Sequence, residues 1–74
     1  MSELKTGDSV KYFGESIINY FSVGFNHFET EGEAVKYASR HKYSYSETID
    51  ECVIVHFTNG RMVALDELKN ILKR

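Results

Sequence analysis

The alternation of apolar and polar residues divides the chain into two pairs of extended segments, each pair followed by a helix. The extended segments are rich in β-branched and aromatic residues, which is typical of strands, and comprise residues 10–13, 17–28, 52–58 and 61–65. Apolar residues at helical spacing follow at residues 30–41 and 66–74. The pattern therefore predicts an α+β fold of order ββαββα, a four-stranded antiparallel sheet with two helices packed on one face.

The first two segments form a hairpin if residues 14–15 make a two-residue turn, since glycine at the first central position suits type II′. That turn places Tyr12 opposite Ile17. One face of the hairpin then carries Val10, Tyr12, Ile17, Phe21, Val23 and Phe25, and we predict this face to be core. Gly24 interrupts the second segment and indicates a β-bulge.

Two local signals place the remaining elements. Thr30 and Glu33 have the T-x-x-E spacing of a capping box, which predicts a helix start. Asn59 and Gly60 separate two apolar segments, and this dipeptide favours a two-residue type I′ turn, which places Phe57 opposite Met62. Both faces of this second hairpin are apolar, so we expect it to be central in the sheet or covered.

The length and net charge of the chain limit the functions that it can have. Seventy-four residues form one small domain, here residues 9–74, and the polar residues 1–8 are expected to be flexible. The net charge is −2 with a pI near 5.9, and the basic residues are scattered. Lys36 and Arg40 fall near a predicted helix C-terminus, where the helix dipole accounts for them. A nucleic-acid partner is therefore disfavoured.

The sequence also argues against several kinds of chemistry. One cysteine favours a reducing cytoplasm, and no apolar run approaches a membrane span or a secretory leader. Cys52 and His56 are too far apart along one strand to bind one zinc ion, and no nucleotide-binding glycine motif occurs. His56 is expected to be partly buried and hydrogen-bonded. We expect no metal site, no cofactor and no catalysis.

A chain this short leaves apolar surface uncovered, because two helices cover only one side of a sheet. The predicted open face carries Phe13, Ile18 and Tyr20, unless the register is shifted by one residue, which would place some of them in the core. A second predicted binding segment is the tyrosine-bearing acidic loop, with Tyr43, Tyr45, Glu47, Asp50 and Glu51. The alternative for the loop is that its rings pack over the sheet edge and its acids are solvated.

These features favour a non-catalytic protein-binding module, expected to be a homodimer, that inhibits or regulates a larger protein by occupying its surface. In size and character the chain is similar to the short accessory proteins of phages and mobile elements, which often occupy a host or defence protein. One alternative is nucleic-acid binding through Lys11, Arg61 and the C-terminal basic residues. Another is an oligomer that sequesters a small ligand between its subunits.

Overall fold

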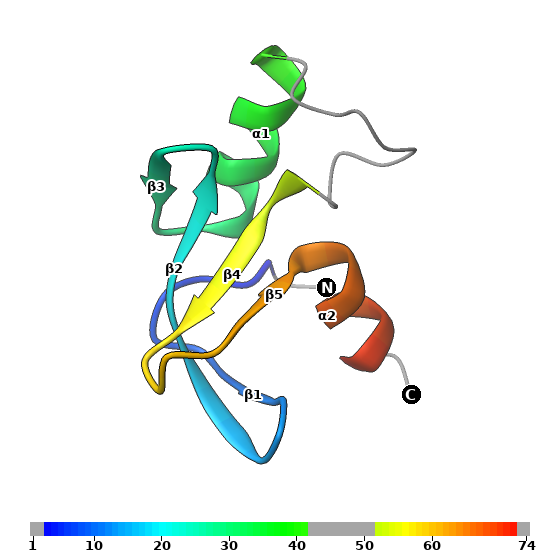
Figure 1. The fold of residues 1–74 in the computed structure, drawn as a ribbon. Coiled ribbons are helices and arrows are strands. Elements are labelled where there is room, and N and C mark those ends of the chain that lie inside the picture. The colour runs from blue at the N-terminus through cyan, green and yellow to red at the C-terminus, as the bar shows by residue number, and fades with distance from the viewer. Residues whose placement is uncertain (1–2, 42–51, 73–74) are drawn as a thin grey trace.

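The computed structural model describes residues 3–41 and 52–72. In chain order the elements are β1 (Ser9–Lys11), β2 (Glu15–Val23), β3 (Asn26–Phe28), α1 (Glu31–His41), β4 (Ile54–Phe57), β5 (Met62–Ala64) and α2 (Leu65–Leu72). The strands form an antiparallel sheet of order β1-β2-β4-β5, and β3 pairs with the end of β2 (Figure 1). The predicted α+β class is confirmed, with β3 as an addition to the predicted element order.

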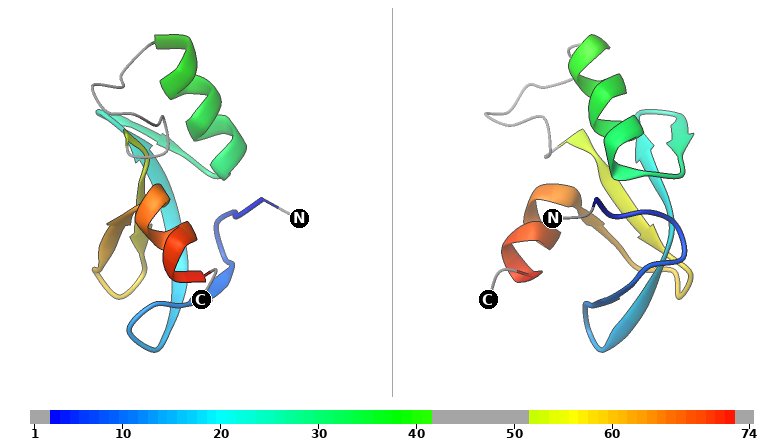
Figure 2. Two further views of the ribbon diagram at one scale, coloured as in Figure 1. Left: turned by 90° about the vertical axis from the view of Figure 1, so that its right-hand side faces the viewer. Right: turned by 180° about the vertical axis from the view of Figure 1, so that it is seen from behind.

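Both helices contribute to a single hydrophobic core on one side of the sheet. The buried apolar residues are Val10, Ile18, Phe21, Val23, Ala34, Ala38, Val53, Val55, Phe57, Val63, Leu65 and Leu68. Figure 2 shows α1 beside the end of β2 that pairs with β3, and α2 beside β5. The alanines of α1 allow the helix to approach the sheet closely, whereas α2 fills its side of the core with leucines.

A β-bulge in β2 decides which side chains enter the core. Ile18 pairs with Phe57, but the next pair along the strands is Tyr20 with His56, so Asn19 is an extra residue. Without a bulge, residues 18 and 20 would share a face. With it, Ile18 is 1% exposed, whereas Ile17 is 44% exposed. The predicted positions of Ile17 in the core and Ile18 on the open face are therefore wrong.

The β1–β2 turn also differs from the prediction. Lys11 pairs with Glu15, so the turn consists of the three residues 12–14 rather than the two residues 14–15. Phe13 and Gly14 both have positive φ angles, of 52° and 90°. The Ser16 hydroxyl donates a hydrogen bond of 2.7 Å to the Tyr12 carbonyl and holds the turn closed. Glycine therefore supplies one left-handed position, and an aromatic residue supplies the other.

Gly24 forms a turn rather than the predicted bulge. Val23 pairs with Asn26, which leaves Gly24 and Phe25 as a two-residue hairpin turn between β2 and β3. Gly24 has a φ of 61°, and Phe25 is not among the positive-φ residues, which is the type II′ pattern. Phe25 is fully exposed at the turn, so its predicted place in the core is wrong.

The second hairpin forms where predicted but with a shift of one residue. Val55 pairs with Val63 and His56 with Met62, so the loop has three residues, Thr58 to Gly60. Gly60 N–H donates to the Phe57 carbonyl at 3.1 Å, and Gly60 has a φ of 90°, which is the pattern of a type I turn followed by a G1 bulge. The Asn59 amide donates to Ser16 Oγ at 3.2 Å. This tertiary contact ties the two hairpin ends together.

The N-terminal segment and α1 hold each other in place. Glu33 N–H donates to Thr30 Oγ1 at 3.2 Å, so the predicted cap is present. Leu4 N–H donates to the Glu31 carboxylate at 3.0 Å, and Lys5 forms a bridge with Thr30. Hydrogen bonds thus connect residues 4–6 to the start of α1, and the flexibility expected for residues 1–8 stays a prediction. Neither helix is long and apolar enough to cross a membrane within the described ranges.

Candidate interaction face

The side of the sheet opposite the core carries a continuous row of side chains that neither helix covers. Residues paired directly across antiparallel strands share a face, so Tyr20, His56 and Met62 lie side by side on β2, β4 and β5. By the same register, Ser22 lies between His27 of β3 and Ile54 of β4. We define the open face by the residues Ile17, Tyr20, Ser22, His27, Ile54, His56, Met62 and Ala64.

A stack of three rings forms the centre of the open face. Tyr20 stacks on His27 with ring centroids 4.3 Å apart and on His56 with centroids also 4.3 Å apart. Because β3 and β4 pair with opposite edges of β2, the tyrosine lies between the two histidines. Stacked rings of this kind stabilise their arrangement beyond simple burial, by roughly 0.5–1.5 kcal/mol for each pair. The open face therefore presents a preformed aromatic surface.

His56 is anchored on this face by a serine. Ser22 Oγ and His56 Nε2 are 2.8 Å apart and share a hydrogen bond. Burial lowers the pKa of His56 below its ordinary value, and the positive charge that His27 can carry lowers it further. Both causes favour the neutral form of the His56 imidazole. The predicted partial burial and hydrogen bonding of His56 are confirmed.

Ser22 and His56 also have the spacing of a nucleophile and its base. A catalytic pair of this type needs a third group to orient the imidazole and donors to stabilise the developing oxyanion. Within residues 3–41 and 52–72, the His56 side chain has no further hydrogen-bond partner, and Ser22 is buried. The pair thus orients the His56 ring and supports the stack.

The composition of the open face is typical of an interface centre. None of its eight residues carries an Asp, Glu, Lys or Arg side chain. Met62 is 59% exposed, and the neighbouring Tyr20 and Ile54 are half-buried. Centres of protein interfaces are depleted in charge and enriched in aromatic residues and methionine, whereas ordinary protein surface is not. This part of the surface is therefore chemically unlike the charged exterior of α1.

The structure places the predicted binding residues in three different environments. Tyr20 lies at the centre of the open face, whereas Ile18 lies in the core on the other side of the sheet. Phe13 is 73% exposed at the β1–β2 turn, where the Arg61 guanidinium lies 4.6 Å from its ring centroid and Tyr12 meets it edge-on. Phe13 and Tyr20 therefore do not form one cluster. The predicted loop residues Tyr43, Tyr45, Glu47, Asp50 and Glu51 lie outside the described residues.

Of the eight open-face residues, sequence reasoning named only Tyr20. It did not name Ile17, Ser22, His27, Ile54, His56, Met62 and Ala64. The signal for Met62 was present, because the second hairpin is apolar on both faces. His27 could not be found from the pattern alone, since the Gly24 turn that folds β3 back beside β2 was interpreted as a bulge. Once β3 is recognised as a strand, its pairing with β2 places His27 opposite Ser22 and next to Tyr20.

Metal ligation and similarity to known proteins add no further assignment. Among the residues that the structure describes, no group of three or more His, Cys, Asp or Glu side chains could hold a metal ion. Comparison with protein-family models, with curated protein sequences and with solved structures finds no match. Only the geometry of this chain therefore bears on its function.

Proposed function

We propose that this chain is a small, non-catalytic protein-binding module that inhibits or regulates a larger protein by occupying its surface, with the open face as the contact surface. The observation that carries this proposal is the stack of Tyr20 between His27 and His56 on a sheet face without Asp, Glu, Lys or Arg side chains. Both helices contribute to the core on the other side of the sheet, so they leave these rings available to a partner.

The small size of the chain favours a partner on energetic grounds. A domain of this length buries only about 60% of the surface of its unfolded chain, so its stability margin is small. Apolar side chains such as Ile17 and Met62 gain roughly 25 cal/mol for each Å² that a partner removes from water. A second copy of the chain can cover the same surface, and we propose homodimerisation through the open face in the absence of the target.

The location and biological class of the protein belong to the same proposal. The single cysteine, Cys52, is free, which is compatible with the reducing cytoplasm. A surface-occupying inhibitor of this size is the kind of accessory protein that phages and mobile elements encode. The nucleic-acid alternative receives less support, because Lys11 pairs opposite Glu15 and Arg61 lies over Phe13, both away from the stacked rings.

The proposal is tested by comparative capture with three tagged forms of the chain. The wild type is compared with Met62→Lys, which adds a charge on the edge strand of the open face, opposite His56, and with Ser39→Lys, which adds the same charge on the exposed side of α1. Circular dichroism first verifies that all three forms are folded. Proteins from the source cell that bind wild type and Ser39→Lys, but not Met62→Lys, support the proposal. Equal capture by all three forms contradicts it.

Light scattering with the same three forms tests self-association. We expect the wild type and Ser39→Lys to show a dimer that dissociates on dilution, and Met62→Lys to remain monomeric at concentrations where they associate. A dimer that persists equally in Met62→Lys would place the self-association surface elsewhere.

A further inference from the structure

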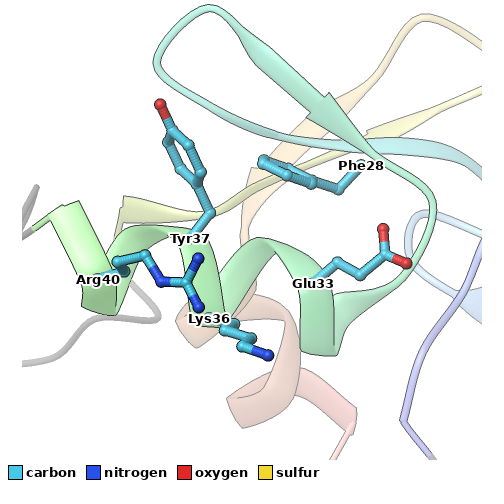
Figure 3. Close-up of a pocket in the computed structure, with 5 residues that line it drawn as sticks. All are labelled: Phe28, Glu33, Lys36, Tyr37 and Arg40. Carbon is cyan, nitrogen blue, oxygen red and sulfur yellow. The ribbon is translucent and has the colours of Figure 1, made fainter.

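We propose that a hollow beside α1 binds a single planar aromatic ring linked to an anionic group. The hollow is shallow, has a volume of about 250 Å³, and is lined by Phe28, Glu33, Lys36, Tyr37 and Arg40 (Figure 3). We call it the α1 hollow. Since α1 packs on the core side of the sheet, the α1 hollow is separate from the open face, and this inference does not depend on the proposed function.

The spacing of the residues along α1 explains how the hollow forms. Glu33, Lys36, Tyr37 and Arg40 follow one another at intervals of three, one and three residues, so they lie on one face of the helix. Ala34 and Ala38 lie on a neighbouring stripe and are buried against the sheet. Phe28, at the end of β3, faces the helix and completes the hollow from the sheet side.

Two rings provide an apolar surface for a ligand ring. The ring centroids of Phe28 and Tyr37 are 5.2 Å apart, and their planes are inclined by 45°, so the rings are tilted rather than stacked. The Asn26 side-chain amide donates a hydrogen bond of 2.8 Å to the Tyr37 hydroxyl and fixes the outer end of that ring. Both rings are half-buried, so each still has surface to offer. A third ring can pack beside them with the offset or edge-on geometry that aromatic groups prefer.

Two cations at the rim provide the recognition of an anion. Lys36 and Arg40 are exposed, one helical turn apart, and neither has an acidic partner within the described part of the chain. The helix dipole accounts for Arg40 in the last turn of α1, but its effect falls off within one turn. Lys36 lies before the last turn, so the dipole does not account for it, contrary to the expectation from the sequence. An arginine guanidinium matches the geometry of carboxylate and phosphate oxygens. Both side chains therefore fit an anionic group.

Glu33 makes the charge distribution along the hollow asymmetric. In Figure 3 its carboxylate lies at the end of the hollow beside Phe28, whereas the Arg40 guanidinium lies at the opposite end, beside Tyr37. The other first-turn acid of α1, Glu31, is engaged with Lys69 at 2.6 Å and adds no negative charge to the hollow. A bound anion is therefore directed to the Arg40 end and its ring to the two aromatic side chains.

The volume limits the size of the ligand. Pockets that enclose drug-sized ligands have volumes of about 300–1,000 Å³. A hollow of about 250 Å³ is smaller than this range and shallow, so it suits one ring and one charged group rather than a dinucleotide or a large cofactor. Aryl carboxylates and aryl phosphates share this chemistry.

The test is a titration of the isotope-labelled full chain, followed by two-dimensional NMR, with four probes. Phenylacetate and phenyl phosphate each combine one ring with an anion, phenol has the ring without the charge, and inorganic phosphate has the charge without a ring. We expect saturable shifts confined to residues 28–40 with at least one of the two combined probes, and at least tenfold weaker binding of phenol and phosphate. Whichever combined probe binds more tightly identifies the anion as carboxylate or phosphate.

Two variants complete the test. Arg40→Gln removes a cation at the rim and is expected to weaken binding of the better probe at least tenfold, whereas Lys11→Gln removes an exposed cation from β1 and is expected to leave it unchanged. Both positions are exposed, so both variants are expected to fold. The proposal is overturned if neither combined probe binds, if phosphate alone binds as tightly, or if Arg40→Gln and Lys11→Gln behave alike.

Discussion

The two faces of the sheet are built from neighbouring residues of the same strands, yet they have different chemistry. On β2 and β4 the core side carries Phe21 and Val55, which are fully buried, whereas the open side carries Tyr20 and His56, which are half-buried and stacked. Two helices of the same chain cover the core side. The open side has ordered side-chain contacts, but no helix covers it. The residues that maintain the fold are therefore distinct from those available for binding.

The largest difference in stability is expected between variants of Ile17 and Ile18, which are adjacent in sequence but lie on opposite faces of the sheet. Ile18→Lys places a charge in the core, which costs several kcal/mol, and we expect this variant to be unfolded. Ile17→Lys places the same charge on the open face, and we expect it to fold with a melting temperature within a few degrees of the wild type. Thermal denaturation followed by circular dichroism distinguishes the two. Equal destabilisation by both variants would contradict the bulge at Asn19.

An effect of intermediate size on stability is expected when the pH is lowered, and it arises from His56 on the open face. The pKa of His56 is lowered in the folded protein, so the unfolded chain binds the proton more readily. The stability that depends on neutral His56 is therefore fully present above the ordinary value of 6.5 and is lost as the pH falls from there through the folded pKa. Urea denaturation at pH 7.5 and pH 5.5 measures the difference.

The matched variant for this prediction is His56→Gln, which retains a hydrogen-bonding side chain that does not titrate. We expect it to lose stability less steeply than the wild type between the same two pH values. An identical pH dependence in both proteins would show that other groups determine the acid response. His27→Gln is expected to have a smaller effect, because the His27 charge is the lesser cause of the lowered pKa.

The smallest effect on stability is expected from Met62→Ala, which removes an exposed side chain from the open face. Because Met62 is 59% exposed, the free energy of unfolding is expected to change by no more than about 0.5 kcal/mol. Its neighbour Val63 is buried, and Val63→Ala is expected to cost about 1 kcal/mol or more through the lost apolar burial. Chemical denaturation of both variants measures the contrast, and a larger loss for Met62→Ala would mean that this side chain is structural.

Local signals in the sequence predicted the elements well, because they depend on residues close together in the chain. The Thr30 cap, the hairpin at Asn59-Gly60 and the α+β class were all accessible in this way. The length of the loop at Asn59 could not be predicted in this way. The Asn59 side chain donates a hydrogen bond to Ser16, which is 43 residues away in sequence, and this contact accompanies the three-residue turn. A two-residue type I′ turn would also need a positive φ at Asn59, which the structure does not have.

The candidate site was less predictable than the fold for a related reason. One extra residue, Asn19, exchanges the faces of every side chain on one side of it, so a strict alternation places Ile17 and Ile18 on the wrong sides. Asn19 is a polar residue between the apolar residues 17–18 and 20–21, but this pattern indicates a bulge only once the structure is known. The Tyr20–His27 contact depends on the reversal of the chain at Gly24 and so required the correct turn type.

The most direct test of the open face is the rate of Met62 oxidation by hydrogen peroxide, followed by mass spectrometry, in the isolated chain and in its complex with a captured partner. The thioether of Met62 is exposed and reacts without any change to the sequence. Acetylation of Lys36, on the exposed side of α1, provides the reference. We predict that the partner slows Met62 oxidation several-fold and leaves Lys36 acetylation unchanged. An unchanged rate at Met62 in a stable complex would contradict the assignment of the open face as the binding surface.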